Sequence, residues 1–332
     1  YSFESYKAHV HDDERPIDRA DLSLLDEVGI NNYILQMKLN RPYFSKLSEE
    51  KIYELLSITR NGVPTLASVL NFGIYPQGLL PQLAITATVI PGTEIGETTN
   101  DGVRFLDNKR IEGTLSEMLD EAIAFCNRNM RTQTIIDQNT GKRNDKTEYP
   151  INAIREAILN ALIHRDYSVH TEGTTIQISF FTNRLEIHSP GRLYGRMTVD
   201  DLGKARPDLR NPALATMSEF LLKTKNRYSG IPTIRREMKE YGLPEPLFEN
   251  KRNEFVVTLF NKTENSINNS EDNTDLITFC KTPRTRQEIS DYLGLKTTQY
   301  VSKNYIQPLV NQGKLKLLDP DKPKSKNQKY YS

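Results

Sequence analysis

Residues 151–164 carry the pattern that most restricts how this chain can fold. Glu156, Asn160 and His164 are spaced by four residues, so at about 100° per residue they lie along one face of a helix. The opposite face and both flanks of this helix are apolar, with Ala153, Ile154, Ala157, Ile158, Leu159, Ala161, Leu162 and Ile163. This pattern leaves little of the helix for water.

The polar stripe of this helix has two interpretations. A carboxylate, an amide and an imidazole on a largely buried helix need partners, because an unpaired buried polar group costs about 1 to 3 kcal/mol and an ion costs more. A bound ligand or metal ion could supply these partners. The alternative is an ordinary amphipathic helix whose polar face lies in solvent or is satisfied by neighbouring loops. The spacing alone does not decide between the two.

The distribution of charge separates the end of the chain from the rest. Lys281 to Ser332 contain eleven Lys and Arg residues against four Asp and Glu, a net charge of +7. Since the whole chain of 332 residues carries +1, the preceding residues sum to −6.

The two cysteines, Cys126 and Cys280, have neither metal-like nor redox spacing, which argues against a disulfide framework and a zinc site. No apolar run approaches about 20 residues and no secretory signal is visible, so we expect no membrane partner and a cytoplasmic location.

Apolar runs bounded by turn residues predict an α+β fold. Helices are expected at 48–59, where Ser48 can cap the first turn, at 114–130, and after Pro150, whose missing amide does no harm at a helix start. Short apolar or alternating runs predict strands at 65–72, 83–90, 102–105, 174–181, 184–188 and 255–260. Residues 137–146 are rich in Asn, Asp, Lys and Gly and predict a loop. Together these elements favour an α/β sandwich with helices on one face of a mixed sheet.

The last part of the chain reads as a separate basic domain. Residues 261–275 contain a single aliphatic residue and predict a flexible linker. After it, a capping box at Thr285 to Glu288 starts one helix, a second helix runs over 298–307, and Pro308 should kink or restart it. A strand at 314–318 completes the pattern of a winged helix.

In a winged helix the second helix enters the major groove and the wing lies near phosphates. The residues that we expect to contact DNA are therefore Thr298, Gln299, Lys303, Lys322, Lys324 and Lys326. The alternatives are a solvated basic tail, or a winged helix used for protein contacts.

Several motifs of the middle region resemble a known family. Residues 150–170 and 185–193, then Arg210-Asn211-Pro212 and Ser229-Gly230-Ile231-Pro232, resemble the GHKL-type ATP-binding domain of bacterial proteins labelled RecG-related or ATP-binding transcriptional regulators. Upstream, residues 62–67 and 72–77 resemble the later part of a Schlafen/AlbA-type DNA-binding domain. The resemblance divides the chain into a partial Schlafen/AlbA-like α/β lobe (1–112), a GHKL-like ATP-binding domain (113–260), the linker (261–275) and the winged helix (276–332).

The resemblance also implies roles for individual residues. Glu156 would orient and deprotonate the attacking water, and Asn160 would bind a Mg²⁺ ion that bridges the phosphates. Nine residues are then expected to contact nucleotide, namely Asn160, His164, Asp166, Ser189, Gly191, Arg210, Asn211, Gly230 and Ile231.

Two loops depart from the family pattern. The turn Ser189-Pro190-Gly191 lacks the aspartate that usually holds the adenine amino group. The glycine pair expected around the phosphates is replaced by Tyr228-Ser229-Gly230.

The resulting expectation is an ATP-responsive DNA-binding transcriptional regulator that uses ATP and Mg²⁺ and forms a homo-oligomer. Whether it hydrolyses ATP stays open. A helicase motor is not expected, because no segment matches the P-loop pattern G-x-x-x-x-G-K-[ST]. The alternative function is a dimerisation and interaction scaffold whose GHKL-like fold no longer binds nucleotide. Nucleic-acid processing by residues 1–112 has no acidic metal triad to support it.

Overall fold

The computed structural model describes residues 11–136, 143–206, 208–222, 230–261, 276–292, 298–311, 313–319, 325 and 328–332. The chain divides into two compact units, unit 1 (Tyr1–Asn261) and unit 2 (Lys262–Ser332). Both contain helices and strands, so the predicted α+β class is confirmed. None of the helices in the described part of the chain is long and apolar enough to cross a membrane.

A six-stranded mixed sheet forms the centre of unit 1, in the order β4-β3-β7-β8-β10-β9. The strands are β3 (Ile85–Val89), β4 (Asp107–Ile111), β7 (Ile176–Phe180), β8 (Arg184–Pro190), β9 (Leu247–Lys251) and β10 (Glu254–Phe260). Strands β3 and β7 pair in parallel, and the other neighbours pair antiparallel. The register aligns Ile178, Ile187 and Val257 across three strands, which gives one face of the sheet a continuous apolar row.

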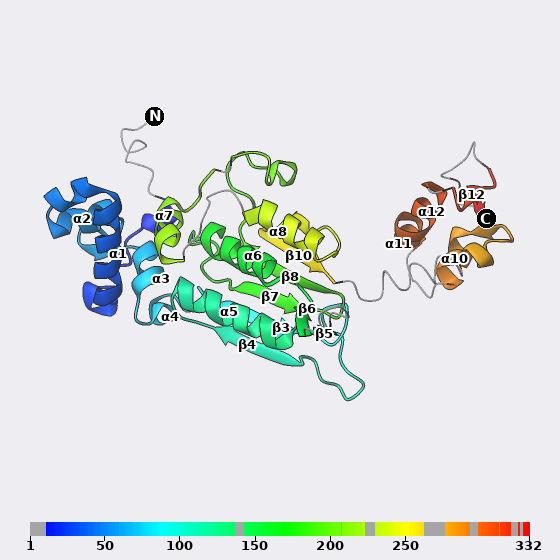
Figure 1. The fold of residues 1–332 in the computed structure, drawn as a ribbon, viewed down its shortest axis with the longest axis horizontal. Helices are drawn as coiled ribbons and strands as arrows, with labels where there is room; N and C mark the ends of the chain where they lie inside the picture. The colour runs from blue at the N-terminus through cyan, green and yellow to red at the C-terminus, as the bar shows by residue number, and fades with distance from the viewer. Residues whose placement is uncertain are drawn as a thin grey trace. The chain divides into compact units, whose positions relative to one another are not determined.

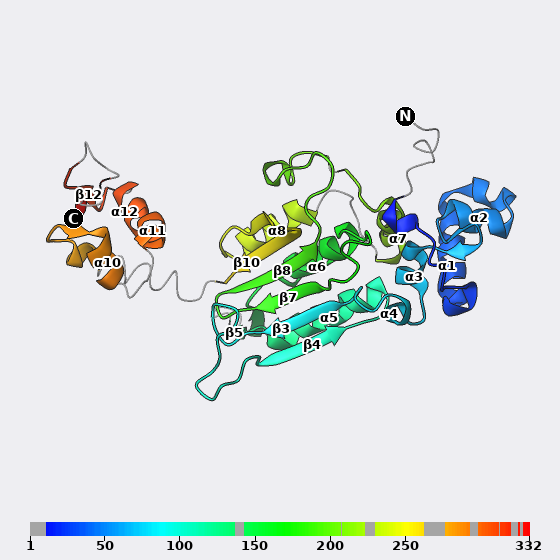
Figure 2. The same cartoon turned by 180° about the vertical axis from the view of Figure 1, so that it is seen from behind.

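Three helices cover this face, α5 (Leu115–Asn129), α6 (Ile151–His164) and α8 (Gly230–Glu240) (Figure 1). Helix α5 begins with a capping box between Thr114 and Glu117, which fixes its first turn. Helix α6 begins after Pro150, as predicted, and buries its apolar residues from Ala153 to Ile163. The hairpin of β7 and β8 is also confirmed. Figure 2, the view from behind, shows the opposite face of the sheet, which these helices do not cover.

The helix-free face of the sheet carries a chain of charged side chains. Nε of Arg184 donates to Oε1 of Glu186 at 2.6 Å. Oε2 of Glu186 lies 2.9 Å from Nε2 of His188, and Nδ1 of His188 lies 3.0 Å from Oε2 of Glu254. Val256 and Thr258 of β10 pair with His188 and Glu186 and are buried, so the network satisfies charged groups on a face that is partly closed to water.

The upstream part of unit 1 is mostly helical. It contains η2 (Asp12–Glu14), η3 (Leu22–Leu24), α1 (Glu27–Asn40), η4 (Pro42–Lys46), α2 (Glu49–Leu55), β1 (Thr59–Arg60), β2 (Val63–Pro64), α3 (Leu66–Phe72) and α4 (Pro76–Leu79). The predicted strand at 65–72 is therefore wrong, since these residues form α3. Oγ1 of Thr65 accepts the amide of Ser68 as an N-cap, and six of the seven helical residues are buried. A short apolar run buried on all sides has no period that distinguishes a helix from a strand.

Two further elements differ from the prediction. The strand expected at 102–105 lies instead at β4, whose polar residues Asn108 and Arg110 are exposed because β4 is an edge strand. The expected loop at 137–146 is partly a hairpin, since Arg143–Thr147 (β6) pairs with Thr132–Ile136 (β5). Residues 137–142 lie outside the described residues.

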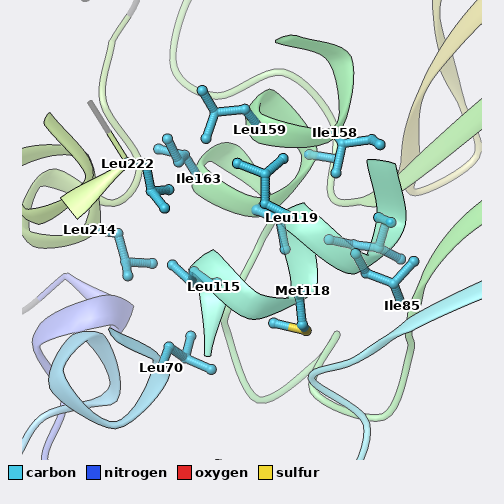
Figure 3. Packing of buried hydrophobic residues seen from close by; sticks show 14 of the residues in the cluster. Leu70, Ile85, Leu115, Met118, Leu119, Ile158, Leu159, Ile163, Leu214 and Leu222 are labelled. Carbon is cyan, nitrogen blue, oxygen red and sulfur yellow. The ribbon is translucent and has the colours of Figure 1, made fainter. Parts of the chain in front are cut away.

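The core of unit 1 is continuous across the expected boundary at 112/113. Leu70, Ile85, Leu115, Ile158 and Leu214 belong to one cluster of buried hydrophobic residues, part of which Figure 3 shows. Because β3 and β4 precede residue 113 but belong to the same sheet as β7 and β8, that boundary would divide one sheet. Residues 1–112 therefore do not fold as a separate lobe, and their assignment to a Schlafen/AlbA-like domain stays a prediction.

Unit 2 has a small core of its own. Its elements are β11 (Arg284–Thr285), α10 (Arg286–Tyr292), α11 (Thr298–Val301), the π-helical turn η6 (Ser302–Ile306), α12 (Gln307–Asn311), β12 (Lys316–Leu317) and β13 (Lys329–Tyr331). The predicted capping box is present, with the amide of Glu288 donating to Oγ1 of Thr285 at 3.2 Å. Helix α12 begins at Gln307, next to Pro308 and directly after the π-helical turn, in keeping with the expected restart at this proline. The strands form a sheet in the order β11-β13-β12.

Candidate functional site

A cavity of about 460 Å³ lies in unit 1, within the size range of small-molecule sites. Helix α6, the end of β8, the segment 191–210 and the start of α8 form its walls. The lining residues are Asn160, His164, Ser189, Gly191, Arg192, Leu193, Tyr194, Met197, Leu202, Gly203, Lys204, Ala205, Arg206, Asp208, Arg210, Gly230, Ile231 and Phe255. Seven of the nine residues expected to contact nucleotide are among them.

Asn160 of α6 and Gly230 of α8 meet at one end of the cavity. A methyl group at Gly230 would lie 2.8 Å from Nδ2 of Asn160, so only glycine permits this approach without displacing the amide. Gly230 is also the first residue of an eleven-residue helix, whose N-terminal amides have no partners within the helix. Together they offer a side-chain amide and backbone donors to the same ligand group.

His164 lies one helical turn after Asn160 and projects into the open cavity. Its side chain is exposed to the cavity. Desolvation by the surrounding protein, followed by the positive charge of Arg210, lowers the pKa of His164 well below its usual value. The imidazole is therefore neutral at pH 7, and it can donate from one nitrogen and accept at the other.

Glu156 lies one turn before Asn160 and does not line the cavity. Its carboxyl group is half-buried, and burial raises its pKa against the smaller opposing effect of Arg155. A carboxylate with a raised pKa is a stronger base than an exposed one. Its distance along α6 places it beyond the Asn160 end of the cavity.

The turn at Ser189 to Gly191 brings four predicted residues together, since Asp166 and Arg210 pack against it. Gly191 has φ +99°, and a methyl group on it would collide with the side chains of Asp166 and Arg210. Oγ of Ser189 donates to the carbonyl of Ala161 at 3.2 Å, which ties β8 to α6. The glycine is thus required both by its backbone conformation and by this close packing.

Two predicted nucleotide contacts lie outside the cavity lining. The Nδ2 group of Asn211 donates to the carbonyls of Ile163 and Arg165, both at 2.8 Å, so Asn211 caps the end of α6. Oδ1 of Asp166 accepts the amide of Ser168 at 2.9 Å, and its side chain packs behind Gly191. These hydrogen bonds give both residues a structural role, although Oδ1 of Asn211 is buried without a hydrogen-bond partner.

The sequence reasoning missed most of the segment 191–210. This segment contributes an apolar wall, with Leu193, Met197 and Leu202, and the single acidic residue of the lining, Asp208. It also contributes four cationic residues, Arg192, Lys204, Arg206 and Arg210. The run of basic residues in 192–210 was the available signal, but a basic run in a loop is usually read as a solvated surface.

The predicted DNA-binding residues lie largely beyond what the structure describes. Thr298 starts α11 and is partly buried. Gln299 and Lys303 belong to the same helical stretch, but their side chains are outside the described part. Lys322, Lys324 and Lys326 also lie outside the described residues. Among the described residues, no group of three or more His, Cys, Asp or Glu could hold a metal ion.

Two family models match parts of the chain. Residues 173–259 match a model described as "Putative ATP-dependent DNA helicase recG C-terminal", of the HATPase type. Residues 274–331 match the C-terminal domain of the Fic-like "Filamentation induced by cAMP" proteins. The first match includes Ser189, Gly191, Arg210 and Gly230 of the cavity, but it begins after α6. Unit 1 is therefore similar to a RecG-related HATPase-type domain over residues 173–259, its last third.

A solved structure shares the fold. The DIP2311 protein from Corynebacterium diphtheriae superposes with a TM-score of 0.58 and 18% sequence identity, over 92% of this chain and 61% of the other. This chain thus spans about three fifths of the length of that neighbour. None of the curated proteins compared shows significant similarity.

Proposed function

We propose that unit 1 binds ATP in the cavity between α6, β8 and α8. One observation carries this proposal: Asn160 and His164, Ser189 and Gly191, and Gly230 come from three separate elements and line one cavity. The match of residues 173–259 to an HATPase-type model supports the same ligand.

The lining fits the two chemically different ends of a nucleotide. Leu193, Met197 and Phe255 supply an apolar wall of the kind that accepts a planar base. The start of α8 at Gly230 offers backbone amides and the positive end of a helix dipole, which favour phosphate. The four cationic residues of the segment 191–210 outweigh the charge of Asp208, so the cavity attracts a polyanion.

Asn160 and Glu156 are the residues that would serve a magnesium-dependent reaction. The amide oxygen of Asn160 is a hard ligand that would hold Mg²⁺ beside the phosphates, where the ion would neutralise their charge. The half-buried carboxylate of Glu156 would accept a proton from a water molecule held next to it.

Calorimetric titration of the full chain with ATP and MgCl₂ tests the proposal. We expect saturable binding that weakens about tenfold or more in Asn160→Ala, because the variant loses the metal ligand. Asn152→Ala is the matched control, since Asn152 lies on the same helix, is exposed and does not line the cavity. Absence of heat at millimolar ATP, with an unchanged melting temperature, would reject ATP as the ligand and favour the nucleotide-independent scaffold.

We also propose that unit 2 binds DNA and that ATP alters this binding. The net charge of +7 over residues 281–332 supports the first part, and helical stretches beside a small antiparallel sheet are compatible with a winged helix. Fluorescence anisotropy with a labelled duplex, with and without ATP and Mg²⁺, measures both effects.

A triple alanine variant at Lys322, Lys324 and Lys326 should weaken DNA binding and reduce the salt dependence. If all three contact phosphates, the slope of log K against log salt falls by about 2 to 3. The matched control replaces three exposed lysines of unit 1, Lys38, Lys46 and Lys51. An equal loss in both triple variants would show that net charge, and not a site on unit 2, drives the binding.

A further inference from the structure

The segment His11–Arg15 joins the upstream helices of unit 1 to the rim of the cavity. On one side, the amide of Leu66 donates to the carbonyl of Arg15 at 2.9 Å. On the other side, Nδ1 of His11 lies 3.1 Å from the carbonyl oxygen of Arg210, and Nη2 of Arg15 donates to Oε2 of Glu172 at 3.0 Å. The segment thus contacts both a cavity residue and the loop that follows α6.

Asp13 is the central residue of this segment and is fully buried. Its Oδ2 accepts the amide of Leu214 at 2.9 Å, the third residue of α7 (Pro212–Leu221). Asn211 stands at the N-cap of α7 but makes no capping bond, because its amide group donates to the end of α6. Asp13 therefore supplies the cap that Asn211 does not, from 201 residues away in the sequence.

Arg210 directly precedes this joint between α6 and α7. Its Nη2 donates to the carbonyl of Arg192 at 2.7 Å, and its guanidinium lies 5.2 Å from the ring centre of Tyr194, so it organises the cavity rim. Because Arg210, Asn211 and Pro212 are consecutive, the first turn of α7 determines where Arg210 lies. Asp13 holds that first turn.

We propose that Asp13 is a positioning residue for the cavity, which caps α7, holds Arg210 at the rim and couples ligand binding to the docking of the upstream helices. The effect of Asp13 on ATP affinity rests on the proposed function, because it requires that the cavity binds ATP. The coupling between Asp13 and the rim is a property of the chain without ligand.

The first test compares ATP affinity in three variants below their melting temperatures. Asp13→Ala should weaken binding by about 5-fold or more, the range of a typical coupling between two sites. Asp13→Asn should bind nearly as tightly as the wild type, because an amide oxygen also caps a helix. Asp26→Ala is the control, since Oδ1 of Asp26 caps α1 through the amide of Val28 at 3.1 Å. Equal affinity of Asp13→Ala and Asp26→Ala would overturn the proposal.

The second test needs no ligand. The amide of Gly191 donates to the carbonyl of Asn253 at 2.6 Å, and the amide of Asp166 donates to the carbonyl of Pro190 at 2.7 Å. Both amides should exchange hydrogen faster in Asp13→Ala than in Asp26→Ala, because the rim loosens. If the wild type binds no ATP, the proposed function fails and exchange alone decides: faster exchange at the rim supports the coupling, and unchanged exchange rejects it.

Discussion

Replacing Asn211 with alanine tests whether this residue holds the end of α6 or contacts a ligand. Asn211 is 1% exposed, and its Nδ2 group donates to the carbonyls of Ile163 and Arg165. The alanine variant removes two hydrogen bonds and leaves two carbonyls without a partner at a buried helix end. Each loss costs about 1 to 3 kcal/mol, and relaxation of the helix end recovers part of it. We expect the free energy of unfolding to fall by about 2 to 4 kcal/mol.

Differential scanning calorimetry of the full chain measures this effect. Unit 1 is the larger unit and gives the larger enthalpy, so its transition can be identified. For a domain of this size the melting temperature falls by about 2 to 4 °C per kcal/mol, which predicts a decrease of roughly 5 to 15 °C. Asn40→Ala is the control, because the exposed Asn40 donates to one carbonyl, that of Gln36 at 2.8 Å. It should change stability by no more than about 0.5 kcal/mol.

A loss of less than about 1 kcal/mol in Asn211→Ala would refute the capping role. The same variant separates structure from binding. Measured well below its melting temperature, it should retain more ATP affinity than Asn160→Ala, because Asn211 does not line the cavity. A lower ATP affinity in Asn211→Ala than in Asn160→Ala would indicate that Asn211 contacts the ligand.

Three further predictions concern the sheet, the turn and the base. Burial opposes ionisation of Glu186, but hydrogen bonds from His188 and Arg184 outweigh burial and lower its pKa to about 2. The contribution of Glu186 to the stability of unit 1 is therefore present above the usual carboxyl pKa and is lost as pH falls toward 2. The hydrogen bonds of His188 likewise outweigh burial and raise its pKa, so its contribution to stability is present in acid and is lost as pH rises through the raised value. In His188→Gln the melting temperature should therefore depend less on pH, both in acid, where Glu186 titrates, and at the higher pH where His188 loses its proton. Gly191→Ala should destabilise unit 1 by about 2 kcal/mol or more in urea unfolding, because of its positive φ and the collision with Arg210, and a neutral result would contradict the packing of this turn. If ATP turnover is observed, Glu156→Gln should reduce kcat at least 100-fold while calorimetry finds ATP binding retained, and unchanged turnover would remove the role of Glu156 as base.

The sequence predicted the elements whose signals are local. The period of the apolar residues in 151–164 and the proline before them determined α6, and Thr114 with Glu117 determined the start of α5. The candidate residues Asn160, His164 and Gly230 followed from spacing and from resemblance, and all three line the cavity. Such signals lie within a few residues of each other, so the sequence contains them completely.

Tertiary structure decided how buried polar groups are satisfied. Asn211 looked like a ligand contact but caps α6, and Asp13, which carried no signal, caps α7 across 201 residues. Residues 66–72 form a helix that is buried on nearly all sides, where apolar residues alone do not distinguish a helix from a strand. Strands β3 and β4 belong to the same sheet as β7, β8, β9 and β10, so the sheet extends across the expected boundary at 112/113. Each outcome depends on which distant segment packs against the residue. For Glu156, Asn160 and His164, the spacing in the sequence determined that they share one face of α6. The cavity beside Asn160 and His164 exists only because the segment 191–210 and α8 pack there, which the tertiary structure decided.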